Sequence, residues 1–452
     1  MTSQVSRRAF LRQASRFAAL GAAAPLGLNL AAIGAASAAT PPDDYRALVC
    51  VFLYGGNDSH NTLVPFDSAT HERYRLARGG LAQSRESLAP LLLNPAVAWP
   101  DGQAFALHPR LQALHAVHER GELALAMRVG TLLHPVTRED FFAQRHLPPK
   151  LMSHNDQFSL WQSLLAEGAQ SGWGGRLGDL LAEDAGQQAS LFTAMSLDQS
   201  AVFSTGGSVN EFMLASEGPI RLAGLPNAPG SEAAMIAALT RPTSHLMARE
   251  LSRRTTIAQA GAAELEAALT GIGDFGLPAT VLGGQLNMVA RLIAARDRLG
   301  MKRQTFFVSL GGFDLHNGLA EMHGDLLQEV SDALAAFQTA MNTAGLGANV
   351  LSFTASDFGR ALTANGDGID HGWAGHHLVM GGAVQPRQWV GAVPRCELGA
   401  PDEVGQGRML PAISVDQLGA TLATWMGVPD SDLATVFPNI GEFEQRTLNL
   451  LR

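Results

Sequence analysis

The chain is 452 residues long, carries a formal net charge of −9, and has a low fraction of charged residues, 16%. A net negative charge gives no electrostatic footprint for nucleic acid and disfavours contact with anionic membrane surfaces, so these two classes of partner are excluded. The length, the 46% of hydrophobic residues and the 48 glycines suit a large globular fold with a large buried core.

An export signal is the first feature along the chain. Arg7 and Arg8 precede a weakly polar stretch rich in Ala, Gly and Leu, which ends at a small-x-small cleavage pattern at residues 36–38. We therefore predict that residues 1–38 form a twin-arginine signal peptide, with an uncleaved membrane anchor as the alternative. The mature chain, 39–452, would pass folded through the twin-arginine translocase into the periplasm or the medium, without stable membrane insertion. Its net charge would be −13, because the signal contains four arginines and no acidic residue.

Apolar runs and helical patterns alternate along the mature chain. Continuous apolar runs, typical of strands buried on both faces of a parallel sheet, occur at residues 47–54, 122–129, 305–310 and 349–354. Helical spacing of apolar residues occurs between them, at 109–120, 280–298 and 320–340. This alternation predicts a doubly wound α/β fold with a largely parallel sheet. The range 190–275, with a long helical stretch at 245–269, is expected to be a helical insertion or cap rather than a separate domain.

Two cysteines occur, Cys50 and Cys396. Cys50 lies within the first apolar run, where a buried free thiol is the expected role. A disulfide between the two stays open, because an exported protein can form one. The cysteines have no spacing typical of a zinc finger.

Aspartate and histidine residues follow the predicted strands. In an open α/β sheet, ligands bind beyond the carboxyl ends of the strands, so a site is expected in these loops. Carboxylate and imidazole groups are suitable ligands for zinc, manganese or iron, and several carboxylates can hold two ions. The candidate metal ligands, from three strand ends and a later glycine-rich loop, are Asp58, Asp314, His316, Asp357, Asp370, His371 and His376, with His377 as a near alternative. An aspartate after a strand can equally be a turn former or a helix N-cap, and the histidine pair can be a strand entry.

Four motifs occur in an order that resembles an exported bacterial family, domain-of-unknown-function family 1501. They are Gly-Gly-Asn-Asp at 55–58, Gly-Gly-Phe-Asp-Leu-His at 311–316, Ser-Asp-Phe-Gly-Arg at 356–360 and Asp-His-Gly-Trp-Ala-Gly-His at 370–376. The family is placed among the alkaline-phosphatase-like proteins, with sulfatases and cofactor-independent phosphoglycerate mutases. The resemblance implies an alkaline-phosphatase-like α/β/α sandwich, two divalent metal ions held by Asp and His at strand ends, and a hydroxyl or modified-cysteine nucleophile.

The sequence also departs from the pattern of that superfamily. Phe358 stands where the superfamily places a histidine, and Gly318 stands where it places a histidine after Asp314. Imidazole must therefore come from the loop that contains Asp370 and His371 or be absent, and His316 is a substitute for the histidine expected after Asp314. The chain has no Cys-x-Pro-x-Arg segment, which argues against a formylglycine sulfatase.

Two hydroxyl side chains are candidate nucleophiles. Ser153 lies in a segment that matches a Ser-His segment of the family, and Thr137 is its rival. Either can also be an ordinary loop or helix-cap residue. Arg360 and Arg138 are candidate oxyanion-binding side chains, because a guanidinium can donate to two oxygens at once. Arg360 can equally cap a helix or pair with a carboxylate.

The combined pattern predicts an exported, metal-dependent hydrolase that acts on a phosphate or sulfate ester of a small molecule or a polymer. The alternative is a non-catalytic exported binding or assembly protein that keeps the fold and has lost part of the site, which Phe358 and Gly318 favour. An exported oxidoreductase is a weaker alternative, because the sequence has no haem, iron–sulfur or dinucleotide motif.

Overall fold

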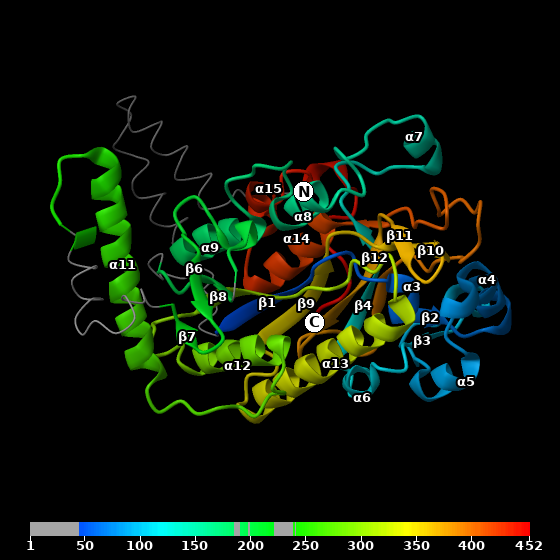
Figure 1. Cartoon of the computed structure of the whole chain (residues 1–452), viewed down its shortest axis with the longest axis horizontal. Helices are drawn as coiled ribbons and strands as arrows, with labels where there is room; N and C mark the ends of the chain where they lie inside the picture. Colours follow the sequence, from blue (N-terminus) through cyan, green and yellow to red (C-terminus); the bar gives the residue numbers. More distant parts are fainter. Residues whose placement is uncertain (1–44, 185–189, 198, 221–237, 240) are drawn as a thin grey trace, which may run out of the picture.

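The computed structural model describes residues 45–184, 190–197, 199–220, 238–239 and 241–452 (Figure 1). The predicted signal peptide at 1–38 lies outside these residues. Within the described ranges, no helix is long and apolar enough to cross a membrane.

A ten-stranded sheet forms the core, with the hydrogen-bonded order β13-β4-β12-β9-β1-β8-β5-β6-β7 and with β14 paired to β4. β1 pairs in parallel with both β8 and β9, and β5 continues the parallel arrangement beside β8. β12 is antiparallel to its two neighbours, β9 and β4. The largely parallel sheet predicted from the sequence is therefore confirmed. The strands are β1 (Arg46–Leu53), β4 (Leu123–Gly130), β5 (Ala194–Leu197), β6 (Phe212–Ala215), β7 (Gly218–Pro219), β8 (Arg303–Leu310), β9 (Val350–Ser356), β12 (Gly375–Met380), β13 (Trp389–Gly391) and β14 (Ile413–Ser414).

The four apolar runs of the sequence form β1, β4, β8 and β9, and each of these strands is buried along its length. Alternate side chains of β1 enter different hydrophobic clusters. Val49 and Val51 belong to one cluster, whereas Cys50 and Phe52 belong to the other. A strand covered on both faces needs apolar residues at every position, which explains why the runs are continuous rather than alternating.

Helices cover both faces of the sheet and complete an α/β/α sandwich (Figure 1). One layer consists of α6 (Gln112–Glu119), α12 (Val281–Ala294) and α13 (Leu319–Thr343), which are the helices predicted at 109–120, 280–298 and 320–340. The other layer includes α9 (Trp173–Asp184), α14 (Val415–Met426) and α15 (Leu433–Val436). Their buried leucines lie in separate clusters, so each face of the sheet has its own core.

The range 190–275, where we expect an insertion, contributes to the sheet as well as to a helix. β5 pairs in parallel with β8, so this range extends the central sheet. α11 (Leu246–Leu269), the helix predicted at 245–269, lies at the same end of the molecule, beyond β6 and β7 (Figure 1). Cys50 and Cys396 are both buried and both free, which confirms the buried thiol expected for Cys50.

Short elements frame the carboxyl edge of the sheet. They are α3 (Ser59–Thr62), β2 (Leu63–Pro65), α4 (Ser68–Arg78), α5 (Arg85–Leu88), β3 (Phe105–Leu107), α7 (Arg138–Phe142), α8 (His154–Ser163), β10 (Arg360–Ala364) and β11 (Ile369–His371). The antiparallel pair β10–β11 lies near α3 and α4 on the right of Figure 1.

Candidate metal centre

The loops after β1, β8 and β9 meet because these three strands are adjacent and parallel. Gly55 follows β1, Asp314 follows β8 and Asp357 follows β9. Gly55 has a φ of +111°, and a Cβ atom at this position would lie 2.4 Å from the backbone nitrogen of Asp314. Glycine is therefore required for the first loop to approach the second.

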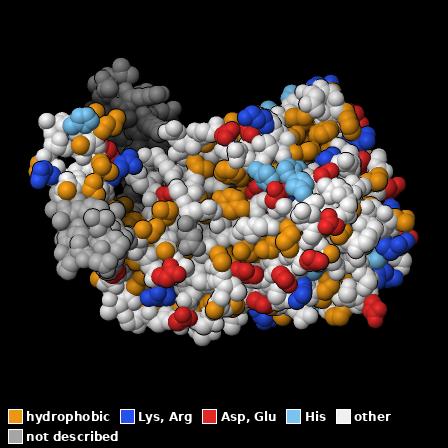
Figure 2. All heavy atoms as spheres, viewed as in Figure 1, with side chains coloured by type: hydrophobic (Ala, Val, Ile, Leu, Met, Phe, Trp, Pro, Cys, Tyr) orange, Lys and Arg blue, Asp and Glu red, His pale blue; other side chains and the backbone are white. Residues whose placement is uncertain are grey.

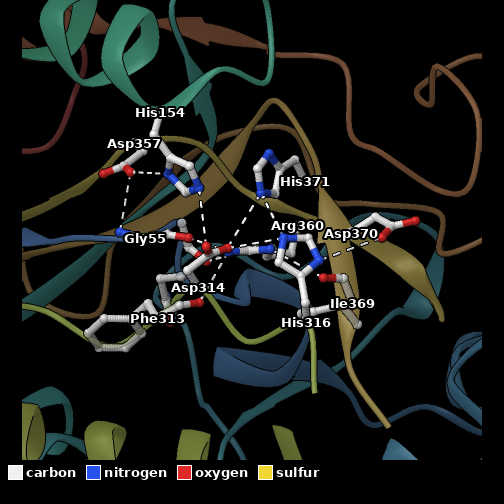
Figure 3. Close-up of polar contacts among 12 residues, drawn as sticks. Gly55, His154, Phe313, Asp314, His316, Asp357, Arg360, Ile369, Asp370 and His371 are labelled. Atoms are coloured by element: carbon white, nitrogen blue, oxygen red, sulfur yellow. Dashed lines mark hydrogen bonds and ion pairs between the residues drawn. The ribbon is translucent and has the colours of Figure 1, made fainter. Parts of the chain in front are cut away.

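Asp314 lies at the centre of a cluster of histidines (Figure 3). Its carboxylate is 3.5 Å from Nε2 of His154, 3.2 Å from Nε2 of His316 and 3.4 Å from Nε2 of His371. These histidines come from α8, from the loop after β8 and from β11, so three separate segments converge on one carboxylate. Figure 2 shows histidine and acidic side chains together on the face of the molecule that it draws. The side chain of Asp314 is 47% exposed. A ligand can therefore reach the cluster from solvent.

The tautomers of two of these histidines are fixed by acceptors on their Nδ1 atoms. His154 Nδ1 lies 2.6 Å from Oδ2 of Asp357, and His371 Nδ1 lies 2.7 Å from the carbonyl oxygen of Met152. Because each acceptor holds an Nδ1–H, the lone pair of each ring is on Nε2, which faces Asp314. Metal-binding histidines in proteins are oriented in this way by a carboxylate or a backbone carbonyl.

The charges of the cluster follow from the same contacts. Burial alone would raise the pKa of Asp314, but the hydrogen bond from Arg360 and the neighbouring positive charges outweigh it and hold that pKa below its usual value. The hydrogen bond with Asp357 raises the pKa of His154, and burial lowers the pKa of His371. Asp314 is therefore an ionised carboxylate, which is the form that binds a metal.

The donor set fits a divalent ion with nitrogen and oxygen ligands. One ligand atom from each of His154, Asp314 and His371 lies within 4.8 Å of the other two. In a tetrahedral site with bonds of about 2.0–2.1 Å, ligand atoms are about 3.3 Å apart. In this cluster His154 Nε2 lies 3.5 Å from Oδ2 of Asp314 and His371 Nε2 lies 3.4 Å from Oδ1, so the two histidines approach different oxygens of one carboxylate. His154 Nε2 is also buried without a hydrogen-bond partner, which leaves its lone pair available. Three protein ligands with an open position are typical of catalytic zinc sites.

His316 differs from the other two histidines. Its Nε2 lies 2.9 Å from Nε2 of His371 and donates an N–H to the lone pair there, a contact that an ion bound to His371 would have to displace. Its Nδ1 lies 3.7 Å from Oδ1 of Asp370. At 46% exposure it is also more open to solvent than His154 or His371. His316 therefore has the properties of a proton donor beside the three candidate ligands.

Phe358, which departs from the pattern of the resembling superfamily, packs beside the cluster. Its ring centroid lies 4.8 Å from that of His154 and 4.5 Å from that of His371. The phenyl ring thus contacts the two candidate ligands instead of supplying one. His154, from a different segment, provides the imidazole next to Asp357.

Arg360, which we expected to bind an oxyanion, is fully buried and forms hydrogen bonds with the backbone instead. Its guanidinium donates to the carbonyl oxygens of Gly55, Gly56 and Ile369, and Nη2 donates to Asp314 Oδ1 at 2.5 Å. These donors are not available to a substrate without breaking the loops apart. The oxyanion-binding prediction for Arg360 is therefore wrong, and its alternative, pairing with a carboxylate, is what the structure contains.

Asp58 and His376 were also predicted as metal ligands, but in the structure both side chains contact other groups of the protein. Asp58 forms a buried ion pair with Arg78. His376 Nδ1 accepts the backbone N–H of Arg128 at 3.2 Å, so a neutral His376 carries its proton on Nε2 and offers no lone pair there. By contrast, Asp314, His316, Asp357, Asp370 and His371 do lie together, although Asp357 and Asp370 contact histidines rather than a common centre.

His154 is the member of the cluster that sequence reasoning missed. It is the residue after Ser153, so the Ser-His segment was noticed for its serine and not for its histidine. Ser153 Oγ donates to Asp156 at 2.8 Å. Thr137 forms a capping box with Asp140 at the start of α7, which confirms its alternative interpretation as a helix cap. Arg138 donates to the carbonyl oxygen of Glu403 at 3.0 Å.

Residues 45–442 match the protein family DUF1501, which is described as a protein of unknown function. The chain belongs to the DUF1501 family. None of the curated proteins matches it. This DUF1501 protein is similar to solved structures at low identity, among them a protein in the alkaline phosphatase superfamily from Vibrio parahaemolyticus, with 10% identity over 85% of this chain and 67% of that one and a TM-score of 0.33. A sulfatase from a Pseudoalteromonas species has 9% identity over 90% and 71% of the two chains and a TM-score of 0.37. At this level of similarity, function has to be inferred from the site itself.

Proposed function

We propose that this DUF1501 protein is an exported, divalent-metal-dependent hydrolase of phosphate or sulfate esters. The observation that carries the proposal is the convergence of His154 Nε2 and His371 Nε2 on the Asp314 carboxylate, with both Nδ1 atoms anchored by acceptors. Metal-binding histidines are oriented by such acceptors, so this anchoring supports a metal at the two Nε2 atoms. The ester class follows from the motif resemblance, and the export from the predicted signal peptide.

His154, Asp314 and His371 would hold the ion, which when bound supplies a Lewis acid that polarises an ester and activates water. Asp357 keeps His154 in the ligating tautomer, and Arg360 holds the Asp314 carboxylate in place. The loop carbonyls of Gly55 and Gly56 in turn fix Arg360. The candidate ligands are thus supported by contacts that leave them little freedom to move.

Water is a better candidate for the nucleophile than Ser153, because the hydroxyl of Ser153 donates to Asp156. His316 stands on the exposed side of the cluster with an N–H on Nε2 and with Asp370 behind its Nδ1. In this position it can transfer a proton from Nε2 to the leaving oxygen of an ester and then take up a proton from solvent.

The second candidate function is a non-catalytic exported binding or assembly protein that keeps the metal site. It is favoured by the burial of Arg360, because the guanidinium expected to stabilise a transferring phosphoryl or sulfuryl group is committed to the backbone. In that case the ion would hold together α8, the loop after β8 and β11 without turning over a substrate.

Elemental analysis of protein purified without chelators tests the metal, and a panel of phosphomonoesters, phosphodiesters and sulfate esters tests the reaction. His154→Ala and His371→Ala should each lose the metal and the activity, whereas His115→Ala, a histidine variant on α6, should keep both. His316→Ala should keep the metal but lose activity. Metal-free wild-type protein, or unchanged metal content in His154→Ala and His371→Ala, would overturn the proposed site. A metal-loaded protein that is inactive on the whole panel would favour the binding protein.

A further inference from the structure

Besides Arg360 and Asp314, another pair of opposite charges lies at the loop after β1, and this pair is buried. Asp58 precedes α3, and Arg78 is the last residue of α4. Nη2 of Arg78 contacts Oδ1 of Asp58, and the side chains of Arg78 and Asp58 are 0% and 1% exposed. A carboxylate so far from water needs a positive partner, because an unpaired buried charge is strongly destabilising. Arg78 supplies that partner from within the chain.

The space around this pair is unsuitable for a cation. The Nε and Nη1 donors of Arg78 are buried and have no hydrogen-bond partner in the structure. Oδ2 of Asp58 is also buried without a hydrogen-bond partner, but the guanidinium already balances the charge of the carboxylate through Oδ1. A divalent ion entering beside Asp58 would lie close to the full charge of the guanidinium, which at short range in a buried site is strongly repulsive.

Two histidines near the pair each use Nε2 in another contact, and Nδ1 of His323 is buried without a hydrogen-bond partner. His60 Nε2 contacts the carbonyl oxygen of Gly407 at 3.3 Å, and His323 Nε2 contacts Asn57 Oδ1 at 3.0 Å. Burial and the charge of Arg78 lower the pKa of His60 and of His323 to about 3, so both rings are neutral. Among the described residues, the histidine, cysteine and acidic side chains come close enough to hold an ion only at His154, Asp314 and His371.

We propose that each chain binds one divalent ion, and that Arg78 replaces a second ion as a fixed internal cation beside Asp58. This inference rests on the proposed function, because it takes His154, Asp314 and His371 as the single metal site. It departs from the two-metal site that the motif resemblance implies. Hydrolysis would then proceed with one ion.

Arg78 also has a positioning role through the loop after β1. Its ion pair holds Asp58, and the same loop presents the carbonyl oxygens of Gly55 and Gly56 to Arg360. Arg360 then donates to Asp314. Two buried arginines thus connect the loop after β1 to the candidate metal ligand after β8.

The direct test is the metal content of the full chain after saturation with Zn²⁺ and removal of loosely bound ions, measured by elemental mass spectrometry against protein concentration. One zinc ion per chain supports the inference. Two ions per chain, with the second lost in Asp58→Asn, would overturn it while leaving the proposed function intact. A content of zero would overturn the proposed function itself, so the two failures are distinguishable.

A double variant tests the role of Asp58 separately. Asp58→Asn combined with Arg78→Met removes both charges at once, so that no buried charge is left unpaired. It should still bind one zinc ion, because neither residue is a ligand, with an affinity reduced by at most the roughly 10–100-fold typical for loss of a supporting contact. Asp314→Asn should lose the ion. Loss of the zinc from a natively folded double variant would show Asp58 to be a ligand. If the double variant does not fold, the number of zinc ions bound per wild-type chain decides whether there is one metal site or two.

Discussion

Oδ2 of Asp357 lies 2.6 Å from Nδ1 of His154, although 203 residues separate them in the chain. Asp357 is 2% exposed, and the same oxygen accepts the backbone N–H of Gly55 at 3.2 Å. The carboxylate thus connects three segments, the loop after β1, the end of β9 and the start of α8. It fixes which nitrogen of His154 carries the proton, and this choice makes the other nitrogen a metal ligand.

Asp357→Asn should weaken metal binding without unfolding the protein. The side-chain oxygen of Asn can take the place of Oδ2 and still accept from Gly55 and His154, but it carries no negative charge to hold the proton on His154 Nδ1. We expect the zinc affinity to fall by about 10–100-fold, the range typical for removal of such a partner. A competition titration with a chromophoric chelator measures it. Asp332→Asn on α13 is the matched control, and an unchanged affinity in Asp357→Asn would contradict the role of the carboxylate.

Substitution of Gly55 should couple stability to metal binding. In Gly55→Ala the new Cβ atom would meet the Asp314 backbone nitrogen at 2.4 Å, at a φ of +111°. We expect a loss of about 1–3 kcal/mol in the free energy of unfolding and a measurable loss of zinc affinity, because the loop that carries Asp314 must move. Gly79→Ala is the control, since Gly79 also has a positive φ, +57°, but open space around it. It should lose about 1 kcal/mol and bind zinc normally; equal zinc affinities in both variants would contradict the expected coupling.

The strands and the layers were accessible from the sequence, whereas the complete site was not. The run at 47–54 predicts β1 because a strand buried on both faces leaves an unbroken apolar signature. Asp314 and Asp357 were found by the same logic, since they follow such strands. His154 starts a helix instead, and only the folded chain brings α8 over the strand ends.

The incorrect ligand predictions have a similar cause. Asp58 follows a strand just as Asp314 does, and its sequence context gives no sign that Arg78, 20 residues later, pairs with it in the interior. The tautomer of His376 is likewise set by the backbone N–H of Arg128, 248 residues away. Position at a strand end therefore predicts which residues are near the edge of the sheet, but not which of them remain free to bind an ion.

Metal binding should weaken as the pH falls, and the pKa of His154 should set the pH at which this weakening begins. Only the neutral ring can ligate, and the hydrogen bond with Asp357 raises the pKa of His154 above the usual 6.5 in the metal-free protein. Below that pKa, the zinc affinity should fall about tenfold for each pH unit, because binding must release one proton. In Asp357→Asn the onset should move to lower pH, as the raising interaction is lost. Chelator titrations between pH 5 and 8 measure both curves, and a common onset would refute the assignment to His154.

Asp416 should make the stability of the fold depend on pH independently of the metal. It lies in the first turn of α14 and is 2% exposed, and burial raises its pKa to about 6, although the backbone N–H of Asn439 donates to it at 3.1 Å. The unfolded chain has a pKa near 3.8 at this residue, so between these two values the folded protein binds more protons than the unfolded one. The contribution of Asp416 to the free energy of unfolding should therefore fall as the pH rises from about 4 to about 6, by at most about 3 kcal/mol. Asp416→Asn, whose amide oxygen can keep the bond from Asn439, should become increasingly more stable than wild type over this interval, whereas the exposed control Asp430→Asn should show no such trend. Urea unfolding at half-unit pH steps measures the difference, and a difference between Asp416→Asn and wild type that stays constant with pH would contradict the raised pKa.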